Sequence, residues 1–396
     1  MPRTKPGLLV ALVTLVSAAL VLLVVIPPWG ASHSRAAGFT RAPLALPLKT
    51  AGNAIVDANG APVILGGIHR TGYKTATGDD MGDLEADSLA HWASMVRIET
   101  SGSLVADSCN SGGAAYLNRL DNIVARLTSR NVVALIDMHI SAPRSCAPAR
   151  DIPMPGANEA TSFWTTIAQR YASNPLVAFE LYNEPHVVTY DQWAAGGPVT
   201  TNGTGTYTAA GMQLMYDTVH SSTTTNLIFV DPPSYASDPK PIANGLLKVD
   251  TARTVWALHV YTCPHPDDTS CVSNSANRTF PAGKPPMGAW DSLSFTKPIV
   301  VTETGFPDST DPTWFTGATA WSAKHSPVIG IIGFSDDGSW QGSPFALTNG
   351  DPAWSPKPAG KPLFDYMSQV QPAEPGQSSP SPSPQASGSP SLSPSP

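Results

Sequence analysis

The 396-residue chain is poor in charge. Only 13% of its residues are Asp, Glu, Lys or Arg, and the net charge of −7 is not gathered in long runs of one sign. A nucleic-acid-binding surface needs clustered Lys and Arg, so nothing in the composition indicates such a partner. The 41% of hydrophobic residues suffice for one barrel-sized domain or two smaller ones.

Cysteine is also scarce, with four residues in the chain. None of them forms a CxxC pair, which argues against a zinc site, and four cysteines fit an oxidising compartment. Cys263 and Cys271 share the short stretch YTCPHPDDTSC, whereas Cys109 and Cys146 lie in two other expected loops. We expect the pairs Cys109–Cys146 and Cys263–Cys271, although the sequence alone allows three connectivities.

The two ends of the chain differ from the part between them. In residues 1–38, Arg3 and Lys5 precede an uncharged apolar run over 7–26, which is the layout of a signal peptide. The run approaches the roughly 20 residues that span a bilayer, so an uncleaved membrane anchor is the alternative. We expect a secreted, extracellular protein, or an anchored one that faces outward. Residues 372–396 are rich in Pro and Ser and predict a disordered tail or linker.

Residues 45–371 alternate between two kinds of segment. Short apolar runs rich in Val and Ile cover 62–68, 94–99, 132–139, 177–184, 226–231, 254–261, 298–304 and 328–334. Continuous apolar character is typical of strands buried on both faces of a parallel sheet. Between the runs, helical spacing is clearest over 114–131, 162–175, 211–220 and 313–325.

This alternation predicts an α/β protein with a (β/α)8 TIM barrel. The stretch NAIVDANGAPVIL before the first run predicts a β-hairpin around Asn59-Gly60, which we expect to cover the bottom of the barrel. An open doubly wound sheet is disfavoured because no Gly-rich phosphate loop follows the first run. A metal-dependent hydrolase of the same fold is disfavoured because GGIHRTG offers one histidine and not an HxH pair, so we expect no metal and no cofactor.

In a barrel of this kind, the active site lies where the strands end, on the C-terminal face. The expected strand ends carry His69, Arg97, Asp137, His139, Asn183, Glu184, His259, Tyr261, Glu303, Phe334, Asp336 and Asp337. Of these, we expect Asp336 and Asp337 to be solvated or to cap a helix.

Glu184 and Glu303 fit the chemistry of glycoside cleavage. A retaining glycosidase needs one carboxyl group to protonate the leaving oxygen and a second, about 5–5.5 Å away, to attack the anomeric carbon. The fourth and seventh strands lie on opposite arcs of an eight-stranded barrel, so their ends face each other across its mouth. The two glutamates therefore predict a retaining glycosidase.

The same positions give the chain a resemblance to glycoside hydrolase family 5, a large retaining family that includes many cellulases. The matching features are Asn183-Glu184-Pro185, Glu303 in VVTETGF, Arg97 in MVRIE, His139 in IDMH, and His259 with Tyr261 in HVY. They occur in the family's order from the first strand to the eighth, over most of residues 50–370. The NEP motif alone is moderately specific, whereas all these features in order are strongly specific.

The resemblance implies a role for each matching residue. Glu184 is the general acid/base and Glu303 is the nucleophile. The residues implied to bind or orient around them are Asn183 on the sugar 2-hydroxyl, Arg97 and Tyr261 on Glu303, and His139 and His259 along the −1 sugar site, with His69 as a further substrate-binding candidate. General chemistry agrees, because a nucleophilic carboxylate needs a cation or donors nearby and the acid needs a raised pKa.

The eighth strand departs from the family. The family usually places a tryptophan there, beneath the −1 sugar. In GIIGFSDDGSW, Phe334 occupies this position and Trp340 follows six residues later. Either residue could be the aromatic contact of the sugar.

We expect a monomer that acts on a β-linked polysaccharide or oligosaccharide, with endo-β-1,4-glucanase activity as the first choice. The alternatives are a β-mannanase, a β-1,3-glucanase or exo-glucosidase, and a glycolipid glycosidase. A non-catalytic carbohydrate-binding relative is a further alternative, although such a protein should have lost a catalytic glutamate and this chain has both. The segments expected to set specificity are 141–158, 186–206 and 262–290.

Overall fold

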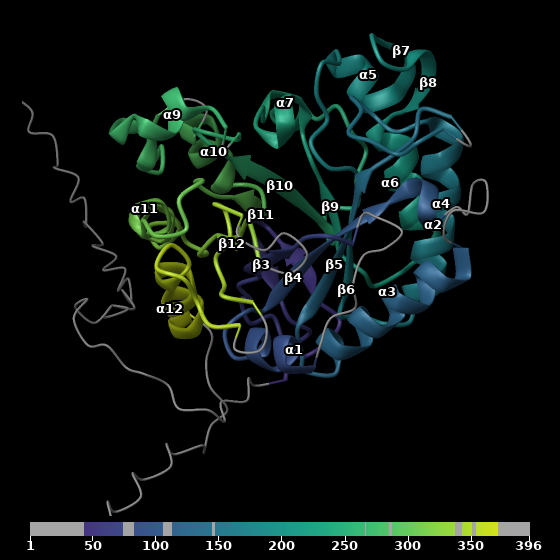
Figure 1. The fold of residues 1–396 in the computed structure, drawn as a ribbon. Coiled ribbons are helices and arrows are strands. Elements are labelled where there is room, and N and C mark those ends of the chain that lie inside the picture. The colour runs from purple at the N-terminus through teal and green to yellow at the C-terminus, as the bar shows by residue number, and fades with distance from the viewer. Residues whose placement is uncertain are drawn as a thin grey trace, which may run out of the picture. The chain divides into compact units, whose positions relative to one another are not determined.

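Eight parallel strands form a closed barrel in the computed structural model of this chain (Figure 1). The structure describes residues 43–73, 83–105, 113–144, 147–265, 267–284, 287–336, 343–350 and 354–370. The barrel strands are β3 (Gly67–Arg70), β4 (Met95–Ser101), β5 (Val133–Ile140), β6 (Val177–Glu180), β9 (Ile228–Val230), β10 (Thr254–Val260), β11 (Ile299–Thr304) and β12 (Gly330–Gly333). Each pairs with the next in this order, and β12 pairs with β3. The predicted (β/α)8 barrel is confirmed, with all eight strands at or beside the predicted apolar runs.

Helices connect the strands and surround the barrel (Figure 1). They are α1 (Asp83–Ala90), α2 (Gly102–Val105), α3 (Gly113–Thr128), α4 (Ala157–Tyr171), α5 (Tyr190–Ala195), α6 (Met212–Ser222), α7 (Pro233–Ala236), α8 (Lys240–Ala243), α9 (Thr269–Ser273), the 3-10 helix η1 (Ser275–Arg278), α10 (Met287–Ser294), α11 (Thr313–Ser322) and α12 (Lys361–Val370). The helices predicted from periodicity correspond to α3, α4, α6 and α11. Their apolar faces pack on the outside of the sheet in one large core.

The N-terminal hairpin is present, but its main turn lies elsewhere than predicted. Strand β1 (Lys49–Ala51) pairs with β2 (Ala54–Val56) across a turn at 52–53. The predicted turn at Asn59-Gly60 also forms, and it returns the chain to a single bridge between Val56 and Pro62. The beginning of the apolar run 62–68 therefore pairs with the hairpin, and only the end of the run belongs to barrel strand β3.

The hairpin covers the bottom of the barrel, as expected. Leu48 and Ile55 belong to the same buried cluster as inward-facing residues near the start of the barrel strands, such as Met95, Leu135 and Phe229. Because side chains alternate between the two sides of a strand, the inward positions two residues further on form the next layer. That layer is polar, and it includes Arg97, Asp137, Glu180, Asp231 and His259, each at most 3% exposed.

A second antiparallel hairpin interrupts the connection between β6 and β9. Strands β7 (Gly196–Thr201) and β8 (Gly205–Ala210) pair with each other and lie between α5 and α6 (Figure 1). The hairpin begins within the segment 186–206, which is expected to set specificity, and it is an addition to the predicted fold. A capping box of Thr189 and Gln192 fixes the start of α5 before it.

The terminal segments predicted above, 1–38 and 372–396, lie outside the described residues. Within the part of the chain that the structure describes, no helix combines the length and the apolar character needed to cross a bilayer.

Candidate active site

Glu303 lies near the end of β11, where three groups surround its carboxylate. Arg97 Nη1 donates to Oε2 at 2.7 Å, and the Tyr261 hydroxyl donates to Oε1 at 2.7 Å. His69 Nδ1 lies 3.7 Å from Oε2. Both oxygens thus accept a hydrogen bond from a fixed donor, which favours the ionised form.

The electrostatic surroundings of Glu303 favour its ionised form. Burial opposes its ionisation, but His259, Arg97, His69 and the Tyr261 hydroxyl together outweigh burial and lower its pKa to about 2. Burial and the charge of Glu303 raise the pKa of Tyr261 well above its ordinary value, so the phenol keeps the proton that it donates. Glu303 is a carboxylate at any pH at which the protein would ordinarily work.

Glu184 follows the end of β6 in a different environment. Its backbone is left-handed, with φ of 50°, an unusual conformation for a residue other than glycine. The Glu184 N–H donates to Asp231 Oδ2 at 3.2 Å, and the following proline has no N–H that would continue the strand. The side chain is 21% exposed, and its Oε1 lies 2.9 Å from His259 Nδ1. Glu184 is therefore held by its neighbours while its carboxyl group reaches solvent.

The two glutamates face each other. One carboxylate oxygen of Glu184 and one of Glu303 lie within 4.8 Å of each other, and both lie within this distance of a ring nitrogen of His259. Retaining glycosidases separate their carboxyl groups by about 5–5.5 Å, whereas inverting ones leave about 6.5–9.5 Å for a water molecule. The observed spacing is the short one.

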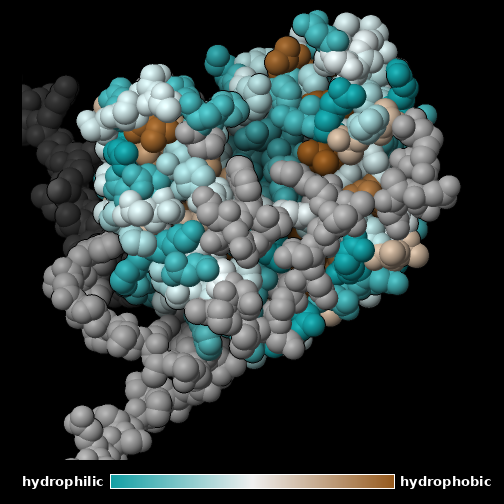
Figure 2. Space-filling model, viewed as in Figure 1, coloured by the Kyte–Doolittle hydropathy of each residue, from teal (hydrophilic) through white to brown (hydrophobic). Residues whose placement is uncertain are grey.

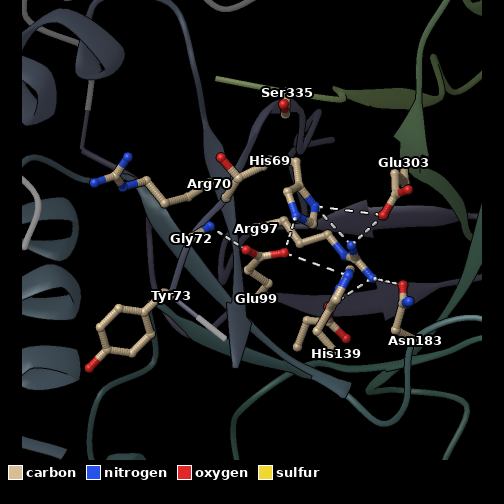
Figure 3. Close-up of polar contacts among 12 residues, drawn as sticks. His69, Arg70, Gly72, Tyr73, Arg97, Glu99, His139, Asn183, Glu303 and Ser335 are labelled. Carbon is tan, nitrogen blue, oxygen red and sulfur yellow. Dashed lines mark hydrogen bonds and ion pairs between the residues drawn. The ribbon is translucent and has the colours of Figure 1, made fainter. Parts of the chain in front are cut away.

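Arg97 is the centre of the polar layer in the barrel. Besides Glu303, its guanidinium donates to Glu180 Oε2 at 2.5 Å and to Asn183 Oδ1 at 2.9 Å, and it lies 3.0 Å from Asp137 Oδ2. Figure 3 shows the guanidinium directed at Glu303 and Asn183. Because Asn183 accepts through Oδ1, its amide N–H groups are left to donate, as a contact with a sugar hydroxyl requires.

His69 is fully buried beside Arg97. Arg97 Nη1 donates to its Nδ1 at 2.8 Å, and its Nε2 lies 3.5 Å from Glu99 Oε2 (Figure 3). Since the guanidinium can only donate, Nδ1 accepts and Nε2 carries the proton. This geometry favours support of Arg97 and Glu303 over direct contact with a sugar, so the substrate-binding role of His69 stays a prediction.

His139 lies at the end of β5 and is partly exposed. Its Nδ1 lies 2.7 Å from Asp137 Oδ2, and its Nε2 lies 3.6 Å from Glu99 Oε2. The side chain is 11% exposed, in contrast to that of Asp137, which is fully buried. His139 is therefore held beside buried carboxyl groups and remains partly exposed.

Phe334 occupies the position expected for the aromatic of the eighth strand. Its ring centroid lies 5.0 Å from that of His69 and 5.5 Å from that of Phe345, a neighbour that the sequence did not indicate. Tyr261 lies edge-on to both phenylalanines. The other candidate, Trp340, lies outside the described residues.

A stacked aromatic pair borders Glu184. Tyr235 is 50% exposed and stacks on His186, with ring centroids 4.7 Å apart and planes within 3°. His186 Nδ1 lies 2.8 Å from the Glu184 carbonyl oxygen, and Tyr235 N–H donates to the Pro185 carbonyl at 3.0 Å. Tyr235 and its neighbours 234 and 236 are all left-handed, so the loop after β9 is constrained next to the NEP turn.

Several charged residues of the site match no motif and were not predicted. Glu99, Glu180 and Asp231 are all fully buried, and each follows an inward-facing residue of its strand by two positions. That spacing was the signal available, because a charged residue in register with inward apolar positions must enter the barrel.

One expectation for this region was wrong. Asp336, expected to be solvated or to cap a helix, is fully buried. It accepts hydrogen bonds from Arg70 Nη1 at 2.6 Å and from Thr71 at 3.0 Å. The buried cation next to it explains its burial. Asp337 lies outside the described residues.

The predicted disulfide between Cys263 and Cys271 is confirmed, with Cα atoms 5.8 Å apart. It closes a loop that begins two residues after Tyr261, on the face of the site. The other predicted pair, Cys109 and Cys146, lies outside the described residues.

Among the described residues, three groups of side chains are close enough to offer ligands to a metal ion: His69, His139 and Glu303; Glu180, Asp231 and His259; and Glu184, His259 and Glu303. In the first group, the guanidinium of Arg97 already engages both His69 and Glu303. In the second, the same guanidinium engages Glu180. Our expectation that the site works without a metal or a cofactor stays a prediction.

A closed (β/α)8 barrel with two facing glutamates at its mouth, one ionised and buried and the other partly exposed, defines the class of glycoside hydrolases. Comparison with known families agrees. Residues 56–325 match the family model described as Cellulase (glycosyl hydrolase family 5). The chain belongs to this family, as its motifs predicted.

Curated relatives are distant and longer. Endoglucanase E-5 of Thermobifida fusca is 23% identical over 242 residues, which cover 59% of this chain and 46% of the relative. Endoglucanase C of Evansella cellulosilytica is 29% identical over 164 residues, which cover 39% of this chain and 18% of the relative. The chain thus spans less than half the length of either relative.

Solved structures share the fold. The catalytic domain of Thermobifida fusca endoglucanase Cel5A matches with a TM-score of 0.57 and 18% identity, over 81% of this chain and 97% of that one. The catalytic domain of the major endoglucanase of Xanthomonas campestris pv. campestris gives 0.59 and 18%, over 82% and 100%. A β-glucanase of Saccharophagus degradans gives 0.57 and 19%, over 81% and 93%. At these identities, the similarity supports a shared fold and nothing more.

Proposed function

We propose that the protein hydrolyses β-glycosidic bonds with retention of configuration, with Glu303 as the nucleophile and Glu184 as the general acid/base. The observation that supports this most directly is the short spacing of the two carboxyl groups, within 4.8 Å between their nearest oxygens. Their unequal environments support the division of roles. The ionised Glu303 is ready to attack, and the solvent-accessible Glu184 can exchange a proton.

In the first step, Glu303 attacks the anomeric carbon while Glu184 gives its proton to the departing glycosidic oxygen. Arg97 and Tyr261 hold the attacking carboxylate in one orientation. As the nucleophile forms its bond to the sugar, its negative charge is neutralised. The ionised Glu184 then takes a proton from water, which attacks the glycosyl–enzyme and releases the sugar.

For the substrate, we propose a β-linked glucan and, first among activities, endo-β-1,4-glucanase. Both curated relatives are named endoglucanases. Thermobifida fusca endoglucanase Cel5A has been solved in complex with cellotetraose, and XacCel5A in complex with cellopentaose. A β-mannanase, a β-1,3-glucanase or exo-glucosidase, and a glycolipid glycosidase use the same pair of carboxyl groups. They are the alternatives.

The test is product release by the purified protein from carboxymethyl cellulose, mannan, β-1,3-glucan and aryl β-glycosides. We expect carboxymethyl cellulose to lose viscosity faster than reducing ends accumulate, because an endo-acting enzyme cuts within chains. Proton NMR of the first product should show the β-anomer before mutarotation. The Glu303→Gln variant is the control for contaminating activity.

The outcomes separate the alternatives. Product release from mannan or β-1,3-glucan alone would contradict the proposed substrate but would leave the proposed mechanism unchanged. The α-anomer as first product would contradict retention. Binding to the glucans without release from any substrate would indicate a non-catalytic relative.

A further inference from the structure

Beneath Glu184 lies a pair of buried carboxyl groups that the two-glutamate mechanism does not use. Glu180, at the end of β6, and Asp231, directly after β9, are both 0% exposed. One oxygen of each lies within 4.8 Å of the other and of a ring nitrogen of His259. Two buried carboxyl groups at this distance repel each other when both are ionised, which favours a proton on one of them.

The surroundings decide which group carries it. Glu180 Oε2 accepts the Arg97 Nε–H at 2.5 Å, so a fixed cation stabilises its charge. Among the residues that the structure describes, Asp231 Oδ2 accepts only from the backbone N–H of Glu184, at 3.2 Å, and His259 Nε2 lies 3.8 Å away. Glu180 Oε1 and Asp231 Oδ1 accept nothing from any N–H or hydroxyl group of the described residues. The proton therefore belongs to Asp231, and it lies toward Glu180.

We propose that Asp231 is a positioning residue for the acid/base Glu184 and that it acts as a neutral carboxylic acid. This rests on the proposed function. Its Oδ1–H donates to Glu180, and its Oδ2 accepts the N–H that fixes the left-handed turn of Glu184.

The directions in which the pKa values of Asp231 and Glu180 are shifted are consistent with this assignment. Burial and the charge of Glu180 raise the pKa of Asp231 well above its ordinary value. Burial also opposes ionisation of Glu180, but its pKa is lowered, and Arg97 is the largest of the causes that act against burial. The charged and titratable groups around Asp231 are Glu180 on β6, Arg97 on β4, Asp137 on β5, His259 on β10 and the Glu184 turn.

The neutral state of Asp231 matters because His259 lies between it and Glu184. His259 Nδ1 is 2.9 Å from Glu184 Oε1, on the opposite side of the ring from Asp231. An ionised Asp231 would favour the imidazolium form of His259, and a cation at 2.9 Å would keep Glu184 ionised. A general acid must hold its proton, so a neutral Asp231 preserves the acid function of Glu184.

The test compares Asp231→Asn with Asp231→Ala in the full chain. Asparagine keeps the shape and the neutral state, with an amide N–H in place of the acid O–H. Alanine leaves the Glu184 N–H without its acceptor and removes the neutral carboxyl group beside Glu180, which keeps Arg97. We expect Asp231→Ala to lower kcat/KM on aryl β-glycosides by about 10- to 100-fold, with the larger losses on poorer leaving groups. Asp231→Asn should recover most of this loss and keep the alkaline limb of the pH profile in place.

An infrared difference spectrum at neutral pH gives a readout independent of activity. The carboxylic-acid C=O band of the wild type should lose intensity in Asp231→Asn. Glu159→Gln is a matched control, because Glu159 is a buried glutamate whose oxygen accepts from Ala142 N and Ser141, away from the glutamate pair. It should leave the alkaline limb unchanged.

Two results would overturn the proposal: an acid band that Asp231→Asn does not reduce, or an alkaline limb that this variant moves by about one pH unit or more, which is the effect of losing a nearby charge. A separate result would instead overturn the assignment of Glu184. If azide fails to restore turnover of Glu184→Gln on an activated substrate, Glu184 is not the acid/base, whereas the infrared result still decides the state of Asp231.

Discussion

Glu303 and Glu184 are the same type of residue in opposite surroundings. Glu303 is buried and accepts from Arg97 and Tyr261, whereas Glu184 is partly exposed and contacts an imidazole. Identical side chains can therefore be tested for different chemistry with one kind of substitution, to glutamine.

Replacing Glu184 with Gln removes the acid but leaves the nucleophile. On poor leaving groups we expect a loss of about 10²- to 10⁴-fold, the usual contribution of a general acid. An activated aryl glycoside should still be attacked, and the glycosyl–enzyme should then hydrolyse slowly for want of a base. Azide needs no base, so it should restore turnover and give the β-glycosyl azide.

Replacing Glu303 with Gln removes the nucleophile, so no glycosyl–enzyme can form. In this variant, azide can attack only at the anomeric carbon itself and gives the α-glycosyl azide or nothing. Product configuration by NMR checks both variants. Reversed anomers would mean that the two roles are exchanged, and full activity in both would mean that this is not the catalytic pair.

Tyr261 tests the electrostatics of the nucleophile. Tyr261→Phe removes the donor at 2.7 Å from Glu303 Oε1. The pKa of Glu303 is lowered to about 2 and activity needs its ionised form, so activity falls as pH drops through this pKa. Loss of the donor raises the pKa and moves the acid limb of kcat/KM to higher pH, with a loss of about tenfold near neutral pH.

The matched control for this change is Tyr207→Phe. Tyr207 lies on β8, in the second hairpin, and its hydroxyl donates to the backbone carbonyl of Met154. This variant should leave the acid limb where it is. An acid limb unmoved in Tyr261→Phe would show that the hydroxyl does not set the ionisation of Glu303.

At the scale of elements, the barrel strands were predictable because each is buried on both faces and reads as a continuous apolar run. The run 62–68 was predicted as one barrel strand, but only its end belongs to β3. Its first part pairs with the hairpin at Pro62. Hydrophobicity indicates that a segment is buried, but it does not indicate which strand the segment pairs with. The hairpin of β7 and β8 escaped prediction because strands rich in Thr and Gly carry no strong apolar pattern.

The candidate site was predictable to a similar extent. Residues that matched a motif, such as Glu184 and Glu303, were named in advance. Glu180 and Asp231 were not named. Each is a single charged residue in an apolar run, and its partners lie on other strands that approach it only when the barrel is closed. Phe345 contacts Phe334, and no sequence spacing relates the two.

The disulfide between Cys263 and Cys271 stabilises the loop after β10. The Cys263→Ala/Cys271→Ala double variant should lose about 2–3 kcal/mol of unfolding free energy, as expected for a short closed loop. Urea unfolding measures this loss. Because Tyr261 belongs to the strand end rather than to the closed loop, kcat at low temperature should fall less than tenfold. A variant as stable as the parent would show that the loop does not contribute to the cooperative unit.

Glu159, on α4, joins three elements. Its Oε1 accepts from Ala142 N and Ser141 after β5 and from Ser103 on α2. Burial raises its pKa, although these donors oppose the change. A carboxyl group with a raised folded pKa contributes stability that is fully present below its unfolded pKa and is lost as pH rises through the folded value.

Gln cannot titrate, so Glu159→Gln should become more stable relative to the wild type as pH rises from about 4 to 7. Urea unfolding at several pH values in this range measures the difference. A difference that stays constant or shrinks as pH rises would contradict the raised pKa.

For the whole molecule, we predict a monomer. Large apolar side chains that are exposed, such as Val187, Leu214 and Phe295, are far apart in sequence, and Figure 2 shows apolar residues scattered over a largely hydrophilic face. Stable self-association usually buries a contiguous apolar patch. Light scattering after size-exclusion chromatography should give the mass of one chain at every loading concentration. A mass that rises with concentration would contradict this.

The division of the barrel interior into an apolar lower layer and a charged upper layer has a consequence for how this protein can evolve. Arg97 links Glu180, Asn183 and Glu303, so a mutation that changes charge at one of these positions disturbs the ionisation of the others. The segments 141–158 and 262–290 lie outside these contacts with Arg97. In a randomly mutagenised library, active clones with a new substrate range should therefore carry their changes in these segments. The residues of the charged upper layer should remain unchanged in these clones.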